Sequence, residues 1–451
     1  MRRVKLLRRR IAEHEVDRVP PFGQLAALGL QHVLAMYAGA VAVPLIVGNA
    51  MGLSQADIGY LIGADLLVSG VGTLIQCLGF WRFGVRLPLM QGCTFAAVTP
   101  MVLIGTTGGG LTAIYGAVIV SGLLMILLAP AWGRLLRFFP PLVTGTVITI
   151  IGVSLLPVAV NWAAGGVGAP SYGQPRNLAL AAVVLLIVLL IQRFAPPMLS
   201  RISVLLAIVV GTLVAIPFGF TDFSGVGDAA VFGVSTPFHF GLPTFEVAAI
   251  VSMAVVTLVT MTETTGDILA VGELVDRPPT AAALADGLRA DGLSTVLGGV
   301  FNTFPYTAYA QNVGLVGLTR VRSRYVVAFG GGILVVLGLL PVLGELVAAI
   351  PMPVLGGAGI AMFGTVAASG IRTLSGVSFA DNGNLIVVAV SLGVGLVPVA
   401  APTIYEHFPL WFRTIMESGI SAGCLTAILL NILFNHGRRP SLRERAEALR
   451  P

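Results

Sequence analysis

Apolar segments long enough to cross a membrane recur along almost the whole sequence. A helix needs about 20 residues to span the ~30 Å hydrocarbon core of a bilayer. The sequence therefore predicts an all-α polytopic membrane protein with fourteen transmembrane segments and no intervening soluble domain. These segments are expected at 22–48, 55–79, 87–106, 111–129, 138–160, 177–194, 199–217, 244–272, 284–302, 303–321, 325–349, 352–370, 383–400 and 413–436.

The composition and the placement of basic residues agree with a membrane location. Hydrophobic residues make up 56% of the chain and charged residues only 10%, which excludes a soluble globular domain. The net charge of +6 comes from arginines clustered between apolar segments, where they indicate cytoplasmic loops, not a nucleic-acid-binding surface. The longest predicted outer loop, 218–243, has no Lys or Arg. We therefore expect a protein of the inner (plasma) membrane with both termini in the cytoplasm and no nucleic-acid partner.

Two stretches, one in each half of the chain, are too polar and too β-like for ordinary spanning helices. "LMQGCTFAAVTPMVLIG" (Leu89–Gly105) lies in the third predicted segment and "NTFPYTAYAQNVGLVG" (Asn302–Gly317) in the tenth. Each begins with alternating polar and apolar residues, contains a Thr-Phe pair and a proline, and continues as an apolar helix. An offset of seven segments reverses the direction of the second copy, which predicts an inverted repeat with interrupted helices at the bilayer midplane. An ordinary span kinked at proline is the alternative.

Few ionisable side chains fall well inside the predicted spans, where a charge is costly and usually functional. Glu263 and Asp267 are four residues apart, so both carboxylates share one helix face. They suit substrate binding and proton coupling, or a structural clamp to Asn312 or Thr94, and Gly266 between them is expected to admit another backbone. His32 suits a hydrogen-bonding clamp or a proton-coupling group, and Asp65 has no evident partner. Six other acids are expected near span ends: Glu246, Asp286, Asp291, Glu345, Asp381 and Glu417.

Three separated motifs resemble those of one family. The string "QNVGLVGLTR" (Gln311–Arg320) is similar to the signature of the nucleobase–ascorbate transporters, also called nucleobase:cation symporter-2. The Gln31-His32 pair and "ETTGD" (Glu263–Asp267) resemble two further motifs of that family, in the same order along the chain. Gln at 311 resembles the xanthine and uric acid permease branch, because uracil-handling members usually have Glu there. Val313 replaces a second Asn of many purine members, so xanthine, urate and guanine-like bases stay open.

The resemblance implies a 7+7 inverted repeat divided into a core domain and a gate domain. The core would comprise residues 21–130 (segments 1–4) and 244–350 (segments 8–11). The gate would comprise residues 131–243 (segments 5–7) and 351–437 (segments 12–14). Residues 1–20 and 438–451 would be cytoplasmic tails.

The resemblance also implies which residues form the binding site. Glu263 would accept a hydrogen bond from the heterocycle, and Gln311 would make a second, bidentate contact. Phe95 and Tyr309 would pack against the base, beside Thr94, and the backbone amide of Ala310 would face it. Asp267, His32, Asn312 and Gln31 would support the site or couple it to protons. The chemistry agrees, because an amide such as Gln311 offers one donor and one acceptor to the alternating rim of a purine dione.

These features predict a secondary active transporter that imports a purine base, xanthine or uric acid, by proton symport with alternating access. Nothing resembles a Na⁺ cage, so H⁺ is expected and Na⁺ is the alternative; no cofactor or metal site is expected. A homodimer is expected only because similar proteins often form one.

Other functions fit the sequence less well. A uracil permease of the same family is the first alternative. An anion exchanger of the same architecture is more distant, because the polar stretches 91–97 and 303–312 contain no Lys or Arg. An enzyme is not expected, since no Ser/His/Asp or metal-ligand spacing is present.

Overall fold

Helices follow one another in the order of the predicted spans. The computed structural model describes residues 14–227, 230–380 and 382–435. The predicted tail 438–451, most of the predicted tail 1–20 and Asp381 lie outside these ranges. The helices and strands are α1 Phe22–Ala50, α2 Gln55–Leu78, β1 Gln91–Cys93, α3 Val98–Ile104, α4 Gly110–Leu128, α5 Trp132–Leu135, α6 Pro141–Ala163, α7 Pro175–Phe194, α8 Pro197–Arg201, α9 Ser203–Ala215, α10 Val247–Leu274, α11 Ala281–Val300, β2 Tyr306–Ala308, α12 Ala310–Thr319, α13 Arg324–Gly338, α14 Pro341–Ala348, α15 Met352–Leu374, α16 Asn382–Ala400, α17 Leu410–Met416 and α18 Gly419–Asn435.

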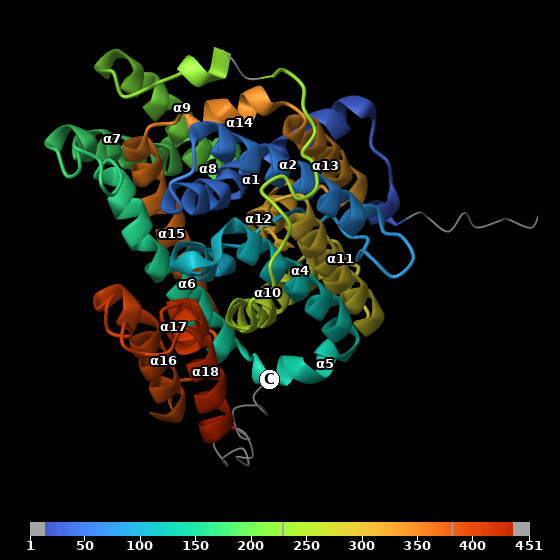
Figure 1. Cartoon of the computed structure of the whole chain (residues 1–451). Helices are drawn as coiled ribbons and strands as arrows, with labels where there is room; N and C mark the ends of the chain where they lie inside the picture. Colours follow the sequence, from blue (N-terminus) through green and yellow to red (C-terminus); the bar gives the residue numbers. More distant parts are fainter. Residues whose placement is uncertain (1–13, 228–229, 381, 436–451) are drawn as a thin grey trace, which may run out of the picture.

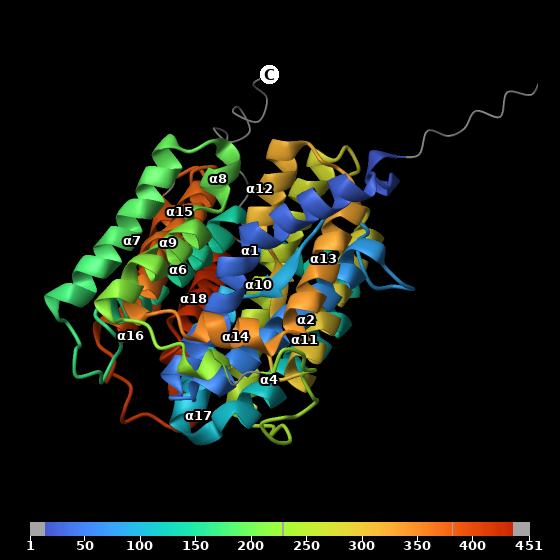
Figure 2. The ribbon, with the colours of Figure 1, turned by 90° about the horizontal axis from the view of Figure 1, so that it is seen from above.

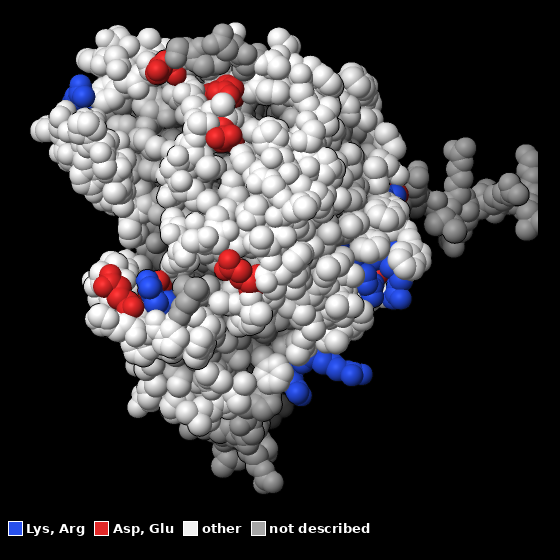
Figure 3. All heavy atoms as spheres, in the orientation of Figure 1, with Lys and Arg blue, Asp and Glu red and all other residues white. Residues whose placement is uncertain are grey.

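The length and apolarity of these helices make the chain a multi-pass membrane protein. Within the described residues, eight helices are long and apolar enough to cross a bilayer, or nine if α13 and α14, which meet at an 82° bend, form one span. Pro341 begins α14, and proline cannot continue the hydrogen bonding of a preceding helix. Large apolar side chains face outward, as Leu127, Leu213 and Leu433 do. On the face drawn in Figure 3, charged side chains are few, with broad uncharged areas between them.

The helices form two groups that lie side by side in both ribbon views (Figures 1 and 2). One group contains α1, α2, α4 and α10 to α13, and the other contains α6 to α9, α15, α16 and α18. The chain therefore passes through each group twice. The most extensive helix contacts are α6 with α15, α2 with α13, and α4 with α11.

The two polar stretches have the extended backbone that the sequence predicts. β1 and β2 pair antiparallel, with Gln91 opposite Ala308 and Cys93 opposite Tyr306. Asn302, with φ of 65°, ends the helical path of α11 before β2. Buried extended backbone needs internal partners inside a membrane, and here each stretch supplies them to the other.

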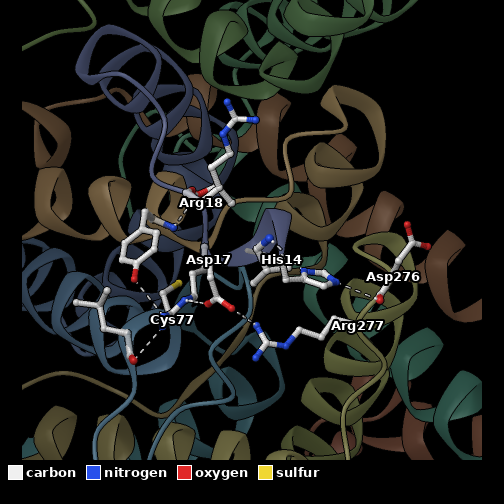
Figure 4. Close-up of polar contacts among 11 residues, drawn as sticks. His14, Asp17, Arg18, Cys77, Asp276 and Arg277 are labelled. Carbon is white, nitrogen blue, oxygen red and sulfur yellow. Dashed lines mark hydrogen bonds and ion pairs between the residues drawn. The ribbon is translucent and has the colours of Figure 1, made fainter. Parts of the chain in front are cut away.

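A short N-terminal segment ties several loops of the first helix group together (Figure 4). It is a single 3₁₀ turn, Glu15–Asp17. Asp17 forms ion pairs with Arg277 and Arg324, each at 2.8 Å. Val16 is completely buried in a cluster of aliphatic side chains from α10, α12 and the loop before β1. We call His14–Arg18 the N-terminal strap.

Replacing Val16 with serine should release the strap. Full burial of a valine contributes about 1.5–3 kcal/mol, so the undocked fraction should rise about tenfold or more. Trypsin cleavage after Arg18 measures this change, because its rate should rise when the strap leaves the surface. Glu15→Gln is the control, because Glu15 is exposed and its ion pair with Arg322 contributes little. Cleavage of the Val16 variant at the wild-type rate would contradict the docking role of this side chain.

Candidate substrate site

The paired strands bring the starts of two short helices to one place. The ladder continues beyond the strands, because the Thr94 N–H donates to the Pro305 carbonyl (2.9 Å) and the Tyr309 N–H to the Met90 carbonyl (3.0 Å). A 3₁₀ turn and α3 follow β1, and α12 follows β2. Since the strands are antiparallel, these helices leave the ladder in opposite directions. The N–H groups of a first helical turn have no intrahelical acceptor, so they are available to a ligand.

Predicted binding residues occupy these two helix starts. Ala310 and Gln311 begin α12 and are both exposed. Phe95 is half-buried, and its ring meets that of Phe363 of α15 edge to face at 5.8 Å between centroids. This contact joins the two helix groups beside the ladder. The site thus offers a free amide and an aromatic face.

Tyr309 and Thr94 are buried and serve the backbone directly. The Tyr309 hydroxyl donates to the Cys93 carbonyl at 2.9 Å, across the ladder. The Thr94 hydroxyl accepts from the Ala96 N–H at 3.2 Å and caps the turn that presents Phe95. Both side chains hold the helix starts in position.

Glu263 and Asp267 lie on α10, four residues apart. Both side chains are half-buried on α10, and neither accepts a hydrogen bond from any residue in the described ranges. The clamp to Asn312 or Thr94 is therefore absent there. A Cβ built on Gly266 would have nothing within 4 Å, so the expected approach of another backbone is wrong. A carboxylate without a protein partner is available to a substrate N–H group.

His32 and Asn312 form a hydrogen-bonding clamp, which is one of the two roles that the sequence allows for His32. The Asn312 amide donates to the His32 carbonyl (2.9 Å) and lies 3.1 Å from His32 Nδ1. Both side chains are buried, and together they join α1 to α12 just after Gln311. The Nε2 of the neighbouring Gln31 is buried and meets no acceptor within the described residues. Asn312 thus supports the site through α1 and not through α10.

Asp291, expected near a span end, is instead completely buried in the middle of α11. Gln76 of α2 donates to its Oδ1 (2.9 Å) and the Thr264 hydroxyl to its Oδ2 (2.5 Å). Thr264 also accepts from the Ala308 N–H (3.2 Å), so this carboxylate connects α2, α11, α10 and β2. A helix expected to begin at residue 284 places Asp291 nearer to its end, whereas α11 begins at Ala281. Gly287 and Gly292, on either side of Asp291, pack closely, since a Cβ there would lie 2.6 Å from Ile268 and 2.7 Å from the Gly122 oxygen. Of the other acids, Asp286, Glu345 and Glu417 are half-buried and Glu246 is exposed.

Electrostatics at the site come from three carboxyl groups. Asp267 lies close enough to interact with both Glu263 and Asp291. None of them forms an ion pair with a described Lys or Arg. In the same ranges no group of three or more His, Cys, Asp or Glu is placed to hold a metal ion. The arrangement can bind a flat heterocycle through acceptors on α10, an amide on α12 and an aromatic ring.

Known proteins resemble the chain in sequence and in fold. A model described as a permease family matches residues 23–404. The uric acid transporter UacT of Escherichia coli is 48% identical over 93% of this chain and 88% of its own length. The xanthine permease of Bacillus subtilis is 47% identical over 92% of this chain and 94% of its own length.

The fold also resembles solved structures of low identity. The transmembrane domain of the cyanobacterial bicarbonate transporter BicA has a TM-score of 0.60 at 16% identity, over 92% of this chain and all of that one. Murine Slc26a9 in the inward-facing state has a TM-score of 0.60 at 12% identity, over 92% of this chain and 69% of that one. The chain is a membrane transporter and not an enzyme, and it belongs to the nucleobase–ascorbate transporter family.

Proposed function

We propose that this protein imports an oxidised purine base, xanthine or uric acid, across the plasma membrane by proton symport. The observation that carries the proposal is the Glu263 carboxylate, which has no hydrogen-bond donor among the described residues. It lies on a helix that packs against β2 and α12, where Gln311 is exposed. Oxidised purines have ring N–H groups for a carboxylate and alternating C=O and N–H groups for an amide. Relatives named for uric acid and xanthine support this choice of substrate.

Equilibrium binding to the purified protein tests the substrate. Radiolabelled xanthine or uric acid should bind, and excess unlabelled purine should displace it while excess uracil does not. Displacement by uracil and not by purines would favour the uracil permease instead. An anion exchanger has little support, because no Lys or Arg occurs in the stretches 91–97 and 303–312.

The proposed architecture has fourteen segments in two inverted sets of seven. Matched helix contacts support it. The second and eleventh segments, α2 and α13, pack together as the ninth and fourth segments, α11 and α4, do. The first and eleventh segments, α1 and α13, likewise pack together as the eighth and fourth, α10 and α4, do. Two glycine contacts match in the same way. A Cβ on Gly70 would lie 2.5 Å from the Gly331 oxygen, and one on Gly292 would lie 2.7 Å from the Gly122 oxygen.

Alternating access would come from movement between two domains. We assign residues 21–130 and 244–350 to the core and residues 131–243 and 351–437 to the gate. The Phe95–Phe363 contact would then lie at the boundary where the substrate is held. Both termini would be cytoplasmic, and a homodimer would fit the proposal but is not required by it.

Proton coupling is assigned to the two carboxyl groups on α10. Glu263 would accept the base, and Asp267, which has no hydrogen-bond donor within the described residues, would bind the proton that enters with it. A proton needs only one such carboxyl, whereas Na⁺ needs several oxygens at short distance. Asn312 holds His32 in a buried clamp, so His32 is the weaker candidate.

Asp267→Asn should separate transport from coupling. The variant cannot release a proton at this position, so it should exchange labelled for unlabelled purine across vesicle membranes but no longer accumulate purine when the outside is acidic. Glu273→Gln is the control, because Glu273 is exposed on the same helix. Accumulation that keeps its pH dependence in both Asp267→Asn and Glu263→Gln would refute the assignment.

A further inference from the structure

Asp65 of α2 is a buried carboxylate that lies outside the proposed substrate and proton path. Its side chain is completely buried and forms no ion pair with a described residue. Its Oδ2 has no hydrogen-bond partner in the described part of the chain. All of its hydrogen bonds converge on the other oxygen, Oδ1. A buried acid with such one-sided bonding calls for a physical reason.

The donors to Oδ1 come from both strands of the ladder. The Cys93 thiol donates from β1 and the Tyr306 hydroxyl from β2, each at 2.8 Å. These two residues are register partners, so their side chains leave the same face of the ladder. Tyr306 also reaches the backbone oxygen of Asp65 at 3.2 Å, and Thr303, just before β2, lies 3.4 Å from Oδ1. One oxygen atom therefore fastens both strands to α2.

The ladder needs such a fastening. Each strand has only three residues, and an isolated pair of strands is at best marginally stable. The side chain of Thr307 lies on the opposite face, where it contacts Thr264 at 3.1 Å. The ladder is thus held on one face by Asp65 and on the other by Thr264 with Asp291.

We propose that Asp65 is a positioning residue that sets the register of β1 against β2 and thereby the geometry of the substrate site. Phe95 follows Cys93 by two residues, and Gln311 follows Tyr306 by five, so a slip between the strands moves the two contact groups relative to each other. Asp65 acts through its acceptor oxygen and does not touch the substrate. The inference rests on the proposed purine transport.

Two substitutions at one position distinguish this role. Asp65→Asn keeps an oxygen acceptor in the place of Oδ1, so its dissociation constant for labelled xanthine or uric acid should stay within about threefold of the wild-type value. Asp65→Ala removes the acceptor of the Cys93 thiol and the closer of the two acceptors of the Tyr306 hydroxyl, and the constant should rise about tenfold or more. Rescue by the asparagine variant is not expected of a group that works through its charge.

Controls on neighbouring residues complete the test. Ser69 also donates to Asp65, at 3.4 Å, but from within α2, so Ser69→Ala should leave binding unchanged. Tyr306→Phe removes one strand donor without emptying the site. It should weaken binding in the wild-type background and have a smaller effect in the Asp65→Ala background, where only the bond to the backbone oxygen of residue 65 is left to lose. This variant keeps the proposal testable even where Asp65→Ala does not fold.

Two results would overturn the proposal. One is wild-type affinity in both Asp65→Ala and Tyr306→Phe. The other is an Asp65→Asn variant that binds normally but no longer accumulates purine in a proton gradient, since Asp65 would then carry the proton. Failure of the wild-type protein to bind either purine would instead contradict the proposed function, so the two failures are distinguishable.

Discussion

Glu263→Gln is expected to raise the dissociation constant for the transported purine about 100-fold. A hydrogen bond to a charged group contributes about 1.5–3 kcal/mol, and 1.4 kcal/mol corresponds to a factor of ten. The substitution keeps the side-chain shape but exchanges one acceptor oxygen for an amide donor, which then faces a ring N–H donor. No residue in the described ranges donates to this carboxylate, so no internal bond is lost and folding should be unaffected.

Equilibrium binding of labelled xanthine and uric acid to the purified variant measures this effect. Glu273→Gln makes the same chemical change ten residues later on α10, at an exposed position, and should bind like the wild type. A melting temperature in detergent equal to that of the wild type would show that the loss is local. Wild-type affinity in Glu263→Gln would remove this carboxylate from the site.

The sequence predicted the interrupted segments because their pattern is local. Polar and apolar residues alternate over a few positions in both stretches and then continue as helix, and the structure has β1 and β2 there. The predictions for Glu263 and Gln311 likewise come from local strings. Features with short periodicity and unusual polarity can be read within one segment.

Contacts between distant segments could not be predicted in the same way. The bonds between Asn312 and His32 join residues 280 positions apart. Nothing in either segment indicates that Asn312 contacts His32 and not Glu263. Asp65 had no evident partner because its two closest donors come from other segments, 28 and 241 positions away. Partner choice depends on how the helices are arranged, which composition does not specify.

Asp291 shows how an error of a few residues in a helix boundary changes a chemical conclusion. Moving the start of α11 from 284 to Ala281 places the carboxylate in the third turn of a buried helix instead of near a membrane surface. Its hydrogen-bond partners show that Asp291 helps to hold the ladder in place. Gln76 and the Thr264 hydroxyl both donate to it, and Thr264 in turn accepts from the Ala308 N–H of β2.

Asp291→Ala should therefore destabilise the protein and abolish uptake together. Two buried donors lose their acceptor, at about 1–3 kcal/mol each, so the free energy of unfolding should fall by about 2–6 kcal/mol. Thr264 directly follows Glu263 on α10 and precedes the turn that presents Asp267. Loss of its hydrogen bond to Asp291 therefore also disturbs both site carboxylates. Uptake of labelled purine into vesicles and the melting temperature in detergent are the two measurements.

Asp286→Ala is the matched control for this prediction, because it removes a carboxylate from the same helix at a half-buried position. Asp286 pairs with Arg289, whose side chain is only 9% exposed, and, at 4.0 Å, with the exposed Arg82. Its removal therefore also lowers stability, because the buried Arg289 loses its partner. Neither arginine belongs to the ladder, so the control should keep nearly wild-type uptake. Asp291→Asn keeps one acceptor oxygen and should fall between the two. If Asp291→Ala melted and transported like Asp286→Ala, then Thr264 and Gln76 would hold the ladder without a carboxylate, and Asp65 alone would have to set its register.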